Sequence, residues 1–259
     1  VKSALLLAGL YAEGETRVTE PHLSRDHSER MLGYFGADIE TFANGVAIRG
    51  GRELSGAHIE VPGDISSAAF FMVAALIVPG SELLLRNVGV NPTRSGVIDI
   101  LTAMGGSIDL ENPRIISGEP VADIIVRGSS LKGVEIGGDL VPRAIDEFPA
   151  ISVAASLAEG RTIIRDAREL RVKETDRIRA MADNLARAGV PVTETEDGME
   201  IVGIDRLAGG VYQSFGDHRI AMSMLIGGLR STSPLTVDDT SCIATSFPGF
   251  TTLLEVVCA

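Results

Sequence analysis

Basic and acidic side chains alternate in one short stretch of the chain, RVKETDR at Arg171–Arg177. The pattern predicts the start of an amphipathic helix, which would place Lys173 and Arg177 on one face. Two cations so placed repel each other by roughly a few tenths of a kcal/mol, and a bound phosphate would reverse that cost. The stretch therefore indicates a site for a small anion. A solvated helix with local salt bridges, such as Glu174 with Arg177, is the alternative that spacing alone leaves open.

Two other stretches place an arginine at the predicted start of a helix. In GDHR, Asp217 is a good N-cap, so Arg219 would lie in the first turn, where free N–H groups favour an anion. In SRDHSER, Ser24 can cap a helix in the same way, with Arg25 in the first turn. A capped helix with a solvated arginine would also explain each stretch. The recurrence of basic residues at equivalent helix starts favours the anion-site interpretation.

A carboxylate is the third chemical element of this candidate site. The segment PRAIDEFPAISVA places Asp146 and Glu147 at the start of a nearly uncharged helix. Burial there is expected to raise the pKa of a carboxyl group, so that it can work as a base. The pattern does not separate Asp146 from Glu147, and a cap or a surface acid is the alternative. No metal site is predicted, because metal-ligand spacing is absent among the histidines His22, His27, His58 and His218.

The elements that must position these residues recur along the chain. The repeated pattern is an apolar helix, a strand, an amphipathic helix and a further strand. The first helix of each copy is apolar nearly all round, so we expect it to be buried. Gly36, Gly105 and Gly189 stand where a helix must stop and turn into a strand, and Asp197-Gly198 fits a hairpin turn. The copies predict an α/β fold of βαβα-type blocks that pack helix against helix.

Composition excludes several classes of function. The net charge of −12 makes a general nucleic-acid or membrane-surface binder a poor interpretation, so any positive charge must be gathered locally. Cys242 and Cys258 are too few for a disulfide framework, which favours a cytoplasmic compartment. The longest apolar run, residues 68–78, is too short to span a bilayer. Val1 opens what reads as a helix already under way, so we expect the chain to be part of a longer polypeptide.

Several motifs, in this order, resemble those of 5-enolpyruvylshikimate-3-phosphate synthases. They are VPGD with SSAA, the Asp146 segment, RVKETDR, GDHRIAM and SFPGF. The combination of RVKETDR with GDHRIAM is highly specific, and the similarity runs from Val1 to about Phe250. SRDHSERML and TSFPGF resemble the bacterial class described as glyphosate-tolerant. UDP-N-acetylglucosamine enolpyruvyl transferases share this kind of fold but are not similar at RVKETDR, and they are the less favoured alternative.

The resemblance implies a two-domain enolpyruvyl transferase-like fold, an inside-out α/β barrel of βαβαββ units around buried helices, with the active site between the domains. Residues 1–61 would be the C-terminal part of the first domain, and residues 62–259 the second domain. The implied reaction joins phosphoenolpyruvate to the 5-hydroxyl of shikimate 3-phosphate and releases phosphate, in the shikimate pathway to chorismate and the aromatic amino acids. It needs neither a metal nor a cofactor, and the full enzyme is expected to be a monomer.

The resemblance also gives the candidate residues their roles. Asp146 lies 27 residues before Lys173, as the family's general base does, which favours it over Glu147. Glu174 matches a proposed proton donor, and Lys173 matches a shikimate-phosphate contact near the transferred proton. The two motif arginines match phosphoenolpyruvate contacts, and residues 24–25 match the segment that grips the shikimate phosphate. The implied substrate-binding residues are therefore Ser24, Arg25, Asp146, Lys173, Arg177 and Arg219.

The chain also departs from the family pattern. Thr245 stands where the family often has a lysine, two positions before Phe-Pro. The family's N-terminal lysine loop, its glycine-rich phosphoenolpyruvate loop and the Ser-Ser/Ala-Gln segment before the first helix are not in this sequence. We therefore expect this chain to be most of a larger enzyme and to be inactive by itself. The alternative is a non-catalytic fragment that needs a separate N-terminal chain for activity.

Overall fold

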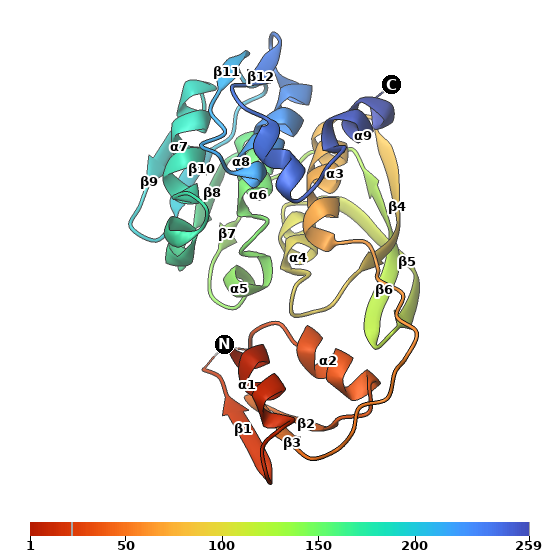
Figure 1. Ribbon diagram of the computed structural model, residues 1–259. Coiled ribbons are helices and arrows are strands. Elements are labelled where there is room, and N and C mark those ends of the chain that lie inside the picture. Colours follow the sequence, from red (N-terminus) through yellow and green to blue (C-terminus); the bar gives the residue numbers. More distant parts are fainter. Residues whose placement is uncertain (22, 259) are drawn as a thin grey trace.

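Helices and strands alternate along the chain, as the sequence predicts for an α/β fold (Figure 1). The computed structural model describes residues 1–21 and 23–258, so one of the four histidines, His22, lies outside the described residues. Two hydrophobic cores divide the elements into a smaller body, at the bottom of Figure 1, and a larger body above it. None of the described helices is long and apolar enough to cross a membrane.

The smaller body contains two helices and three strands: α1 (Lys2–Gly9), β1 (Glu15–Thr19), α2 (His27–Tyr34), β2 (Asp38–Phe42) and β3 (Gly45–Arg49). The strands form an antiparallel sheet in the order β1-β3-β2. Leu6 and Leu32 of the helices pack on Val46 and Ile48 of the central strand. Gly36, with φ 89°, ends α2 and turns the chain toward β2, as predicted.

The prediction that the first helix of each copy is buried is wrong for α1. Leu5 and Leu7 are 44% and 52% exposed, whereas Leu6 between them is fully buried. The buried residues of α1 are Lys2, Leu6 and Gly9, which follow helical spacing along a single face. That face contacts α2, β1 and β3, and the other apolar residues of α1 have no layer above them in the described chain.

Three largely apolar helices form the centre of the larger body: α3 (Ile65–Ile77), α6 (Phe148–Ser156) and α8 (His218–Gly227). In α3 and α6 every residue except Ser67 is buried, which confirms the burial predicted from their all-round apolar pattern. Each large side chain buried here, such as Phe70 or Met72, contributes roughly 1.5–3 kcal/mol through removal from water. The central helices therefore provide a rigid support for residues at their N-terminal ends.

Sheets and outer helices surround this centre. The strands are β4 (Glu82–Gly89), β5 (Ser107–Ile116), β6 (Glu119–Arg127), β7 (Glu135–Ile136), β8 (Arg161–Ile164), β9 (Val192–Glu194), β10 (Met199–Val202), β11 (Gly210–Tyr212) and β12 (Leu235–Val237). They form sheets in the orders β4-β6-β5, β7-β8-β10-β9 and β11-β12. The outer α-helices are α4 (Gly96–Ala103), α5 (Leu140–Ala144), α7 (Arg177–Arg187) and α9 (Phe250–Val257). Short 3-10 helices complete the body: η1 (Arg168–Val172), η2 (Gly228–Arg230) and η3 (Ser241–Thr245).

The predicted repeat is visible in the order of these elements. The second copy runs α3-β4-α4-β5-β6 and the third runs α6-β8-α7-β9-β10. Gly105 and Gly189 follow α4 and α7 with φ 89° and 85°, a left-handed conformation that ends each helix as predicted. The predicted hairpin at Asp197-Gly198 joins β9 and β10, which pair antiparallel.

The predicted starts of two helices are wrong by a few residues. α7 begins at Arg177, and its N-cap Asp176 accepts a hydrogen bond from the N–H of Arg179 at 3.0 Å. Lys173 is extended and precedes α7, so it does not share a helical face with Arg177. α2 begins after Asp26, so Ser24 is not its cap. In both stretches a second residue that can cap lies closer to the apolar run and defines the start.

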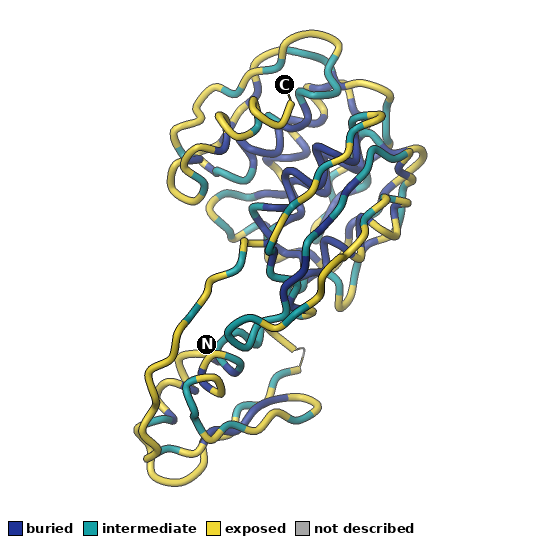
Figure 2. Tube along the Cα trace, turned by 90° about the vertical axis from the view of Figure 1, so that its right-hand side faces the viewer, coloured by how far each residue is buried: buried dark blue, intermediate teal, exposed yellow. Residues whose placement is uncertain are grey.

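The two bodies are joined by an exposed, irregular segment and by polar contacts. The segment runs through residues 50–64, and Figure 2 shows it as a long, mostly exposed stretch of chain that connects the bodies. His27 Nδ1 lies 2.8 Å from Glu119 Oε1, and Asn91 Nδ2 donates to Asp26 Oδ1 at 2.6 Å. These contacts hold α2 of the smaller body against the larger one. The domain boundary after residue 61 stays a prediction.

Candidate active site

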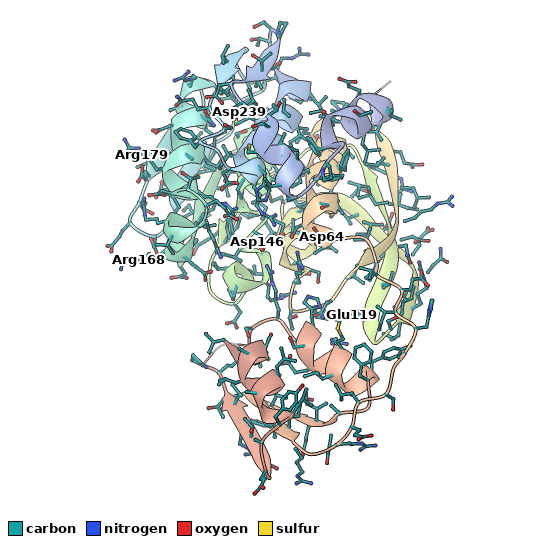
Figure 3. The ribbon with its side chains drawn as sticks, in the orientation of Figure 1. Asp64, Glu119, Asp146, Arg168, Arg179 and Asp239 are labelled. Atoms are coloured by element: carbon teal, nitrogen blue, oxygen red, sulfur yellow. The ribbon has the colours of Figure 1, made fainter. Side chains whose placement is uncertain are left out.

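A cavity of about 340 Å³ lies between the two bodies and is lined by residues of both. Asp146, labelled in Figure 3, stands on the side of the larger body that faces the smaller one. The lining includes Ser24 and Arg25 from the smaller body, together with Asp146 and Lys173 from the larger one. Four of the six predicted substrate-binding residues therefore meet in one cavity, whereas Arg177 and Arg219 are not among its lining residues.

Asp146 is surrounded by cations. Its Oδ2 accepts a hydrogen bond from Arg25 Nη2 at 2.6 Å. Arg177 Nη1 lies 3.7 Å from Oδ1, and Arg219 Nη2 lies 4.0 Å from Oδ2. Burial raises the pKa of this carboxyl group, but the hydrogen bond from Arg25 and the charges of Arg219 and Lys173 outweigh burial and lower the pKa. The predicted raised pKa of Asp146 is therefore wrong, because the local sequence does not show which cations fold against it.

The raised pKa belongs to the neighbouring residue, Glu147. This residue is 1% exposed, and burial raises its pKa against the opposing hydrogen bond of Ser66 and charge of Arg219. The Ser66 hydroxyl donates to Glu147 Oε1. The two adjacent carboxyl groups are thus pushed toward opposite protonation states, a difference that the sequence pattern left open. An ionised Asp146 is the member of the pair that reaches the cavity.

Arg177 is a fully buried arginine that connects α7 to α8. Its Nε donates to Asp217 Oδ2 at 2.8 Å, and Asp217 is itself fully buried. Its Nη2 donates to Glu174 Oε2 at 2.6 Å, so the local salt bridge considered from the sequence is present. Its Nη1 has no hydrogen-bond partner in the described part of the chain and is the atom that approaches Asp146. Asp217 also caps α8 through the N–H of Arg219, as predicted.

Arg219 is the least compensated of the site's arginines. Arg25 and Arg177 each donate to a carboxylate at 2.6 Å. The carboxyl oxygens nearest to Arg219 are 3.9 Å away on Glu147 and 4.0 Å away on Asp146. Its Nη1 donates instead to the backbone carbonyl of Asp146 at 3.1 Å. A guanidinium held this way keeps donors and charge for an external anion.

Lys2 was missed by sequence reasoning, although it lines the same cavity. Its ammonium group lies 2.8 Å from Glu20 and 2.7 Å from Glu29, and it donates to the carbonyl of Ser24 at 3.3 Å. The Ser24 hydroxyl in turn donates to Glu20. This buried network holds the loop before α2 in place. A single charged residue in the apolar stretch KSALLLAG is the signal that could have indicated it.

The remaining candidates lie at the edge of the site. The side chain of Glu174 is 54% exposed and is directed at Arg177 rather than into the cavity. Lys173 pairs with Glu169 at 2.5 Å, and both line the cavity. Within the described residues, no group of His, Cys, Asp and Glu side chains could hold a metal ion. The arrangement is therefore suited to bind anions and to move a proton at Asp146.

Comparisons with known proteins show the family of the chain. A protein-family model described as EPSP synthase (3-phosphoshikimate 1-carboxyvinyltransferase) matches residues 1–254. A 3-phosphoshikimate 1-carboxyvinyltransferase from Geotalea uraniireducens is 77% identical over 99% of this chain and 60% of its own length. The Geobacter sulfurreducens relative of the same name is 71% identical with the same coverage. The chain thus spans about three fifths of the length of these curated relatives.

Solved structures give the same result for the fold. An EPSP synthase from Acinetobacter baumannii matches with a TM-score of 0.94 and 53% identity, covering 99% of this chain and 59% of that one. The enolpyruvyl transferase NikO from Streptomyces tendae matches with a TM-score of 0.76 and 19% identity, covering 98% and 58%. The second likeness concerns the fold alone. Together they confirm the predicted enolpyruvyl transferase-like fold.

Proposed function

This chain belongs to the EPSP synthase family, and we propose that it carries a large part of an active site for enolpyruvyl transfer from phosphoenolpyruvate to shikimate 3-phosphate. The acceptor is the 5-hydroxyl group, and phosphate is released. The reaction serves chorismate and aromatic amino acid biosynthesis and uses no cofactor. We place the whole enzyme in the cytoplasm as a monomer, with residues 1–61 in its first domain and residues 62–259 in its second.

The observation that carries this proposal is the cluster of cations around one ionised carboxylate in a cavity lined by both bodies. Arg25, Lys173, Arg177 and Arg219 all act on Asp146. Because the net charge of the chain is −12, such a local concentration of positive charge needs a specific reason. Two substrates that both carry phosphate groups supply that reason. The carboxylate of Asp146, at the centre of these cations, supplies a base between them.

Asp146 is proposed to take the proton of the 5-hydroxyl. Its lowered pKa keeps it ionised, and its Oδ2 accepts a hydrogen bond from Arg25. As the phosphate of shikimate 3-phosphate approaches Ser24 and Arg25, Arg25 exchanges its carboxylate partner for the phosphate. That exchange frees Oδ2 and raises the proton affinity of Asp146 at the moment when a base is needed.

The second proton movement concerns the enol methylene of phosphoenolpyruvate. The hydroxyl oxygen forms a bond to C2 while the methylene gains a proton, which gives a tetrahedral intermediate. Loss of a proton from the new methyl group and departure of phosphate from C2 then restore the double bond. Glu174 and Lys173 are the proposed groups for this proton exchange, because Glu174 accepts a hydrogen bond from Arg177 and the charge of Lys173 acts on Asp146.

The two motif arginines are proposed to bind phosphoenolpyruvate. Within residues 1–21 and 23–258, Arg219 has no carboxylate within hydrogen-bond distance, and Arg177 has an unpartnered Nη1 that is directed toward Asp146. Asp217 fixes the Arg177 guanidinium through an ion pair and caps the helix of Arg219 through the backbone N–H of that residue. The Arg219 guanidinium is itself held by the backbone carbonyl of Asp146 at 3.1 Å. Fixed donors of this kind bind a carboxylate or phosphate with little loss of side-chain entropy.

Acceptor specificity tests the proposal directly. A polypeptide that carries this sequence at the full length of its relatives is incubated with phosphoenolpyruvate, and phosphate release is followed with shikimate 3-phosphate as the acceptor. We expect release with this acceptor and none with UDP-N-acetylglucosamine. Release with the UDP-sugar alone would instead favour a different enolpyruvyl transferase.

The isolated 259-residue chain provides a second test. We propose that it does not turn over shikimate 3-phosphate by itself, because it spans about 60% of the length of its relatives. Mixing it with a polypeptide of the additional segment and measuring phosphate release separates complementation from an inert fragment. Turnover by the isolated chain would refute this part of the proposal.

A further inference from the structure

Arg219 has two carboxyl groups beside it, each at the outer limit of an ion pair, and its guanidinium is not hydrogen-bonded to either. Its guanidinium nitrogens lie 3.9 Å from Glu147 Oε1 and 4.0 Å from Asp146 Oδ2. Asp146 is already engaged by Arg25 at 2.6 Å. Among the described residues Glu147 has no cation at such a distance, so its failure to draw Arg219 closer needs an explanation.

The surroundings of Glu147 favour its neutral form. It is 1% exposed, and its Oε2 has no hydrogen-bond partner among the described residues. Its Oε1 accepts from the Ser66 hydroxyl, which itself accepts from Arg94 Nη2 at 2.9 Å. A carboxylate in such a place would leave a charged oxygen buried without a donor, at a cost that far exceeds that of a buried neutral carboxyl group. Burial also raises the pKa of Glu147, which agrees with the geometry.

Each element packed around Glu147 contributes an identified polar group. On α3 the polar group is the hydroxyl of Ser66. In the loop before α4 it is the guanidinium of Arg94, which donates to Ser66 and forms an ion pair with Asp64 at 2.8 Å. On α8 the group is the guanidinium of Arg219. Asp146 directly precedes Glu147 in the chain, and its negative charge opposes ionisation of Glu147. From α7, Arg177 is directed at Asp217 rather than at Glu147. Arg219 is thus the cation that an ionised Glu147 would capture.

We propose that Glu147 is a neutral positioning residue, which packs against Arg219 without binding it and so leaves that guanidinium available to a substrate anion. The inference deepens the proposed function and rests on it for the identity of the anion, phosphoenolpyruvate. An ionised glutamate at this position would form a buried ion pair with Arg219 and compete with the substrate. The neutral acid supplies shape and a hydrogen-bond acceptor for Ser66 without that competition.

Infrared difference spectroscopy tests the protonation state without any reference to turnover. At about pH 7 ordinary glutamates, with a pKa of about 4.3, are ionised. We therefore expect the 259-residue chain to show the C=O stretch of a protonated carboxyl group, which shifts in heavy water and is lost in Glu147→Gln. Glu135→Gln is the matched control, since Glu135 pairs with Arg165 on the surface, and it should leave the band in place. A spectrum without a band that depends on Glu147 overturns the proposal.

Equilibrium binding of phosphoenolpyruvate tests the effect on Arg219. The polypeptide carrying this sequence at the length of its relatives is titrated by calorimetry. We expect Glu147→Ala to weaken binding by about 10-fold through the lost support of Ser66 and Arg219, and Glu147→Gln to recover most of that loss. Equal weakening by Ala and Gln would show that a negative charge is required and would overturn the proposal. If both tests succeed but shikimate 3-phosphate is not turned over, the proposed function fails while the inference about Glu147 stands.

Discussion

Replacing Asp217 by alanine should destabilise the chain more than any surface substitution. Asp217 is fully buried, and its Oδ2 accepts from Arg177 Nε at 2.8 Å. Its Oδ1 accepts from the N–H of Arg219 at 2.8 Å and caps α8. The alanine variant removes both contacts. It leaves the buried guanidinium of Arg177 with the half-exposed Glu174 at 2.6 Å and the more distant Asp146 at 3.7 Å.

The magnitude follows from two separate losses. Removing one partner of a buried ion pair costs about 3–5 kcal/mol, because the other charge stays buried. Losing an N-cap costs about 1 kcal/mol. We therefore expect Asp217→Ala to lower the free energy of unfolding by about 4–6 kcal/mol. Asp217→Asn keeps the cap and should cost about 1 kcal/mol less than the alanine variant.

Urea unfolding of the 259-residue chain, followed by circular dichroism, measures these differences. The control is Glu200→Gln, which breaks the exposed pair between Arg161 and Glu200 at 3.2 Å and should cost less than about 1 kcal/mol. Adding Arg177→Met to Asp217→Ala should recover part of the loss, because the unpaired charge is removed. A loss below about 1 kcal/mol for Asp217→Ala, or strictly additive losses in the double variant, would refute the reasoning.

The remaining predictions concern a helix end and the pH dependence of the site. Gly189→Ala should cost about 1 kcal/mol in urea unfolding, because φ at this position is 85° and no neighbouring atom lies within 4 Å to add a clash. The pKa of Asp146 is lowered in the folded chain, so its contribution is present above its unfolded pKa of about 3.9 and lost as the pH falls. Arg25→Ala should therefore cost about 1 kcal/mol at neutral pH, and the difference from the parent should shrink on acidification; a difference independent of pH would contradict the ion pair.

Local patterns in the sequence predicted the elements well. The three buried helices, the cap at Asp217 and the glycine that ends α7 each depend on residues within a few positions of one another. The predicted start of a helix was wrong where two residues that can cap lie close together, as Ser24 and Asp26 do before α2. A local rule cannot decide between such residues when tertiary contacts contribute, and Asp26 also binds Asn91 in the loop between β4 and α4, as well as Arg30 of α2.

The sequence and the family resemblance proposed the members of the site but did not predict its electrostatics. Asp146 meets Arg25 across 121 positions, and Arg177 meets Asp217 across 40 positions. Residues so far apart in the sequence form no helical or strand pattern that would indicate their contact. The lowered pKa of Asp146 could therefore not be derived from its neighbours in the sequence. The resemblance to a family supplied the grouping that local physics could not. The structure then showed which carboxyl group reaches the cavity and which one is buried behind it.

The central claim is that Asp146 is the base of an enolpyruvyl transfer site. The most direct measurement compares phosphate release by the parent and by Asp146→Asn, in a polypeptide that carries this sequence at the length of its relatives. Asparagine keeps the size of the side chain but cannot accept the hydroxyl proton. We expect kcat to fall by about 10²–10⁴-fold while both KM values stay within about 3-fold of the parent. A kcat within about 3-fold of the parent would contradict the assignment of the base.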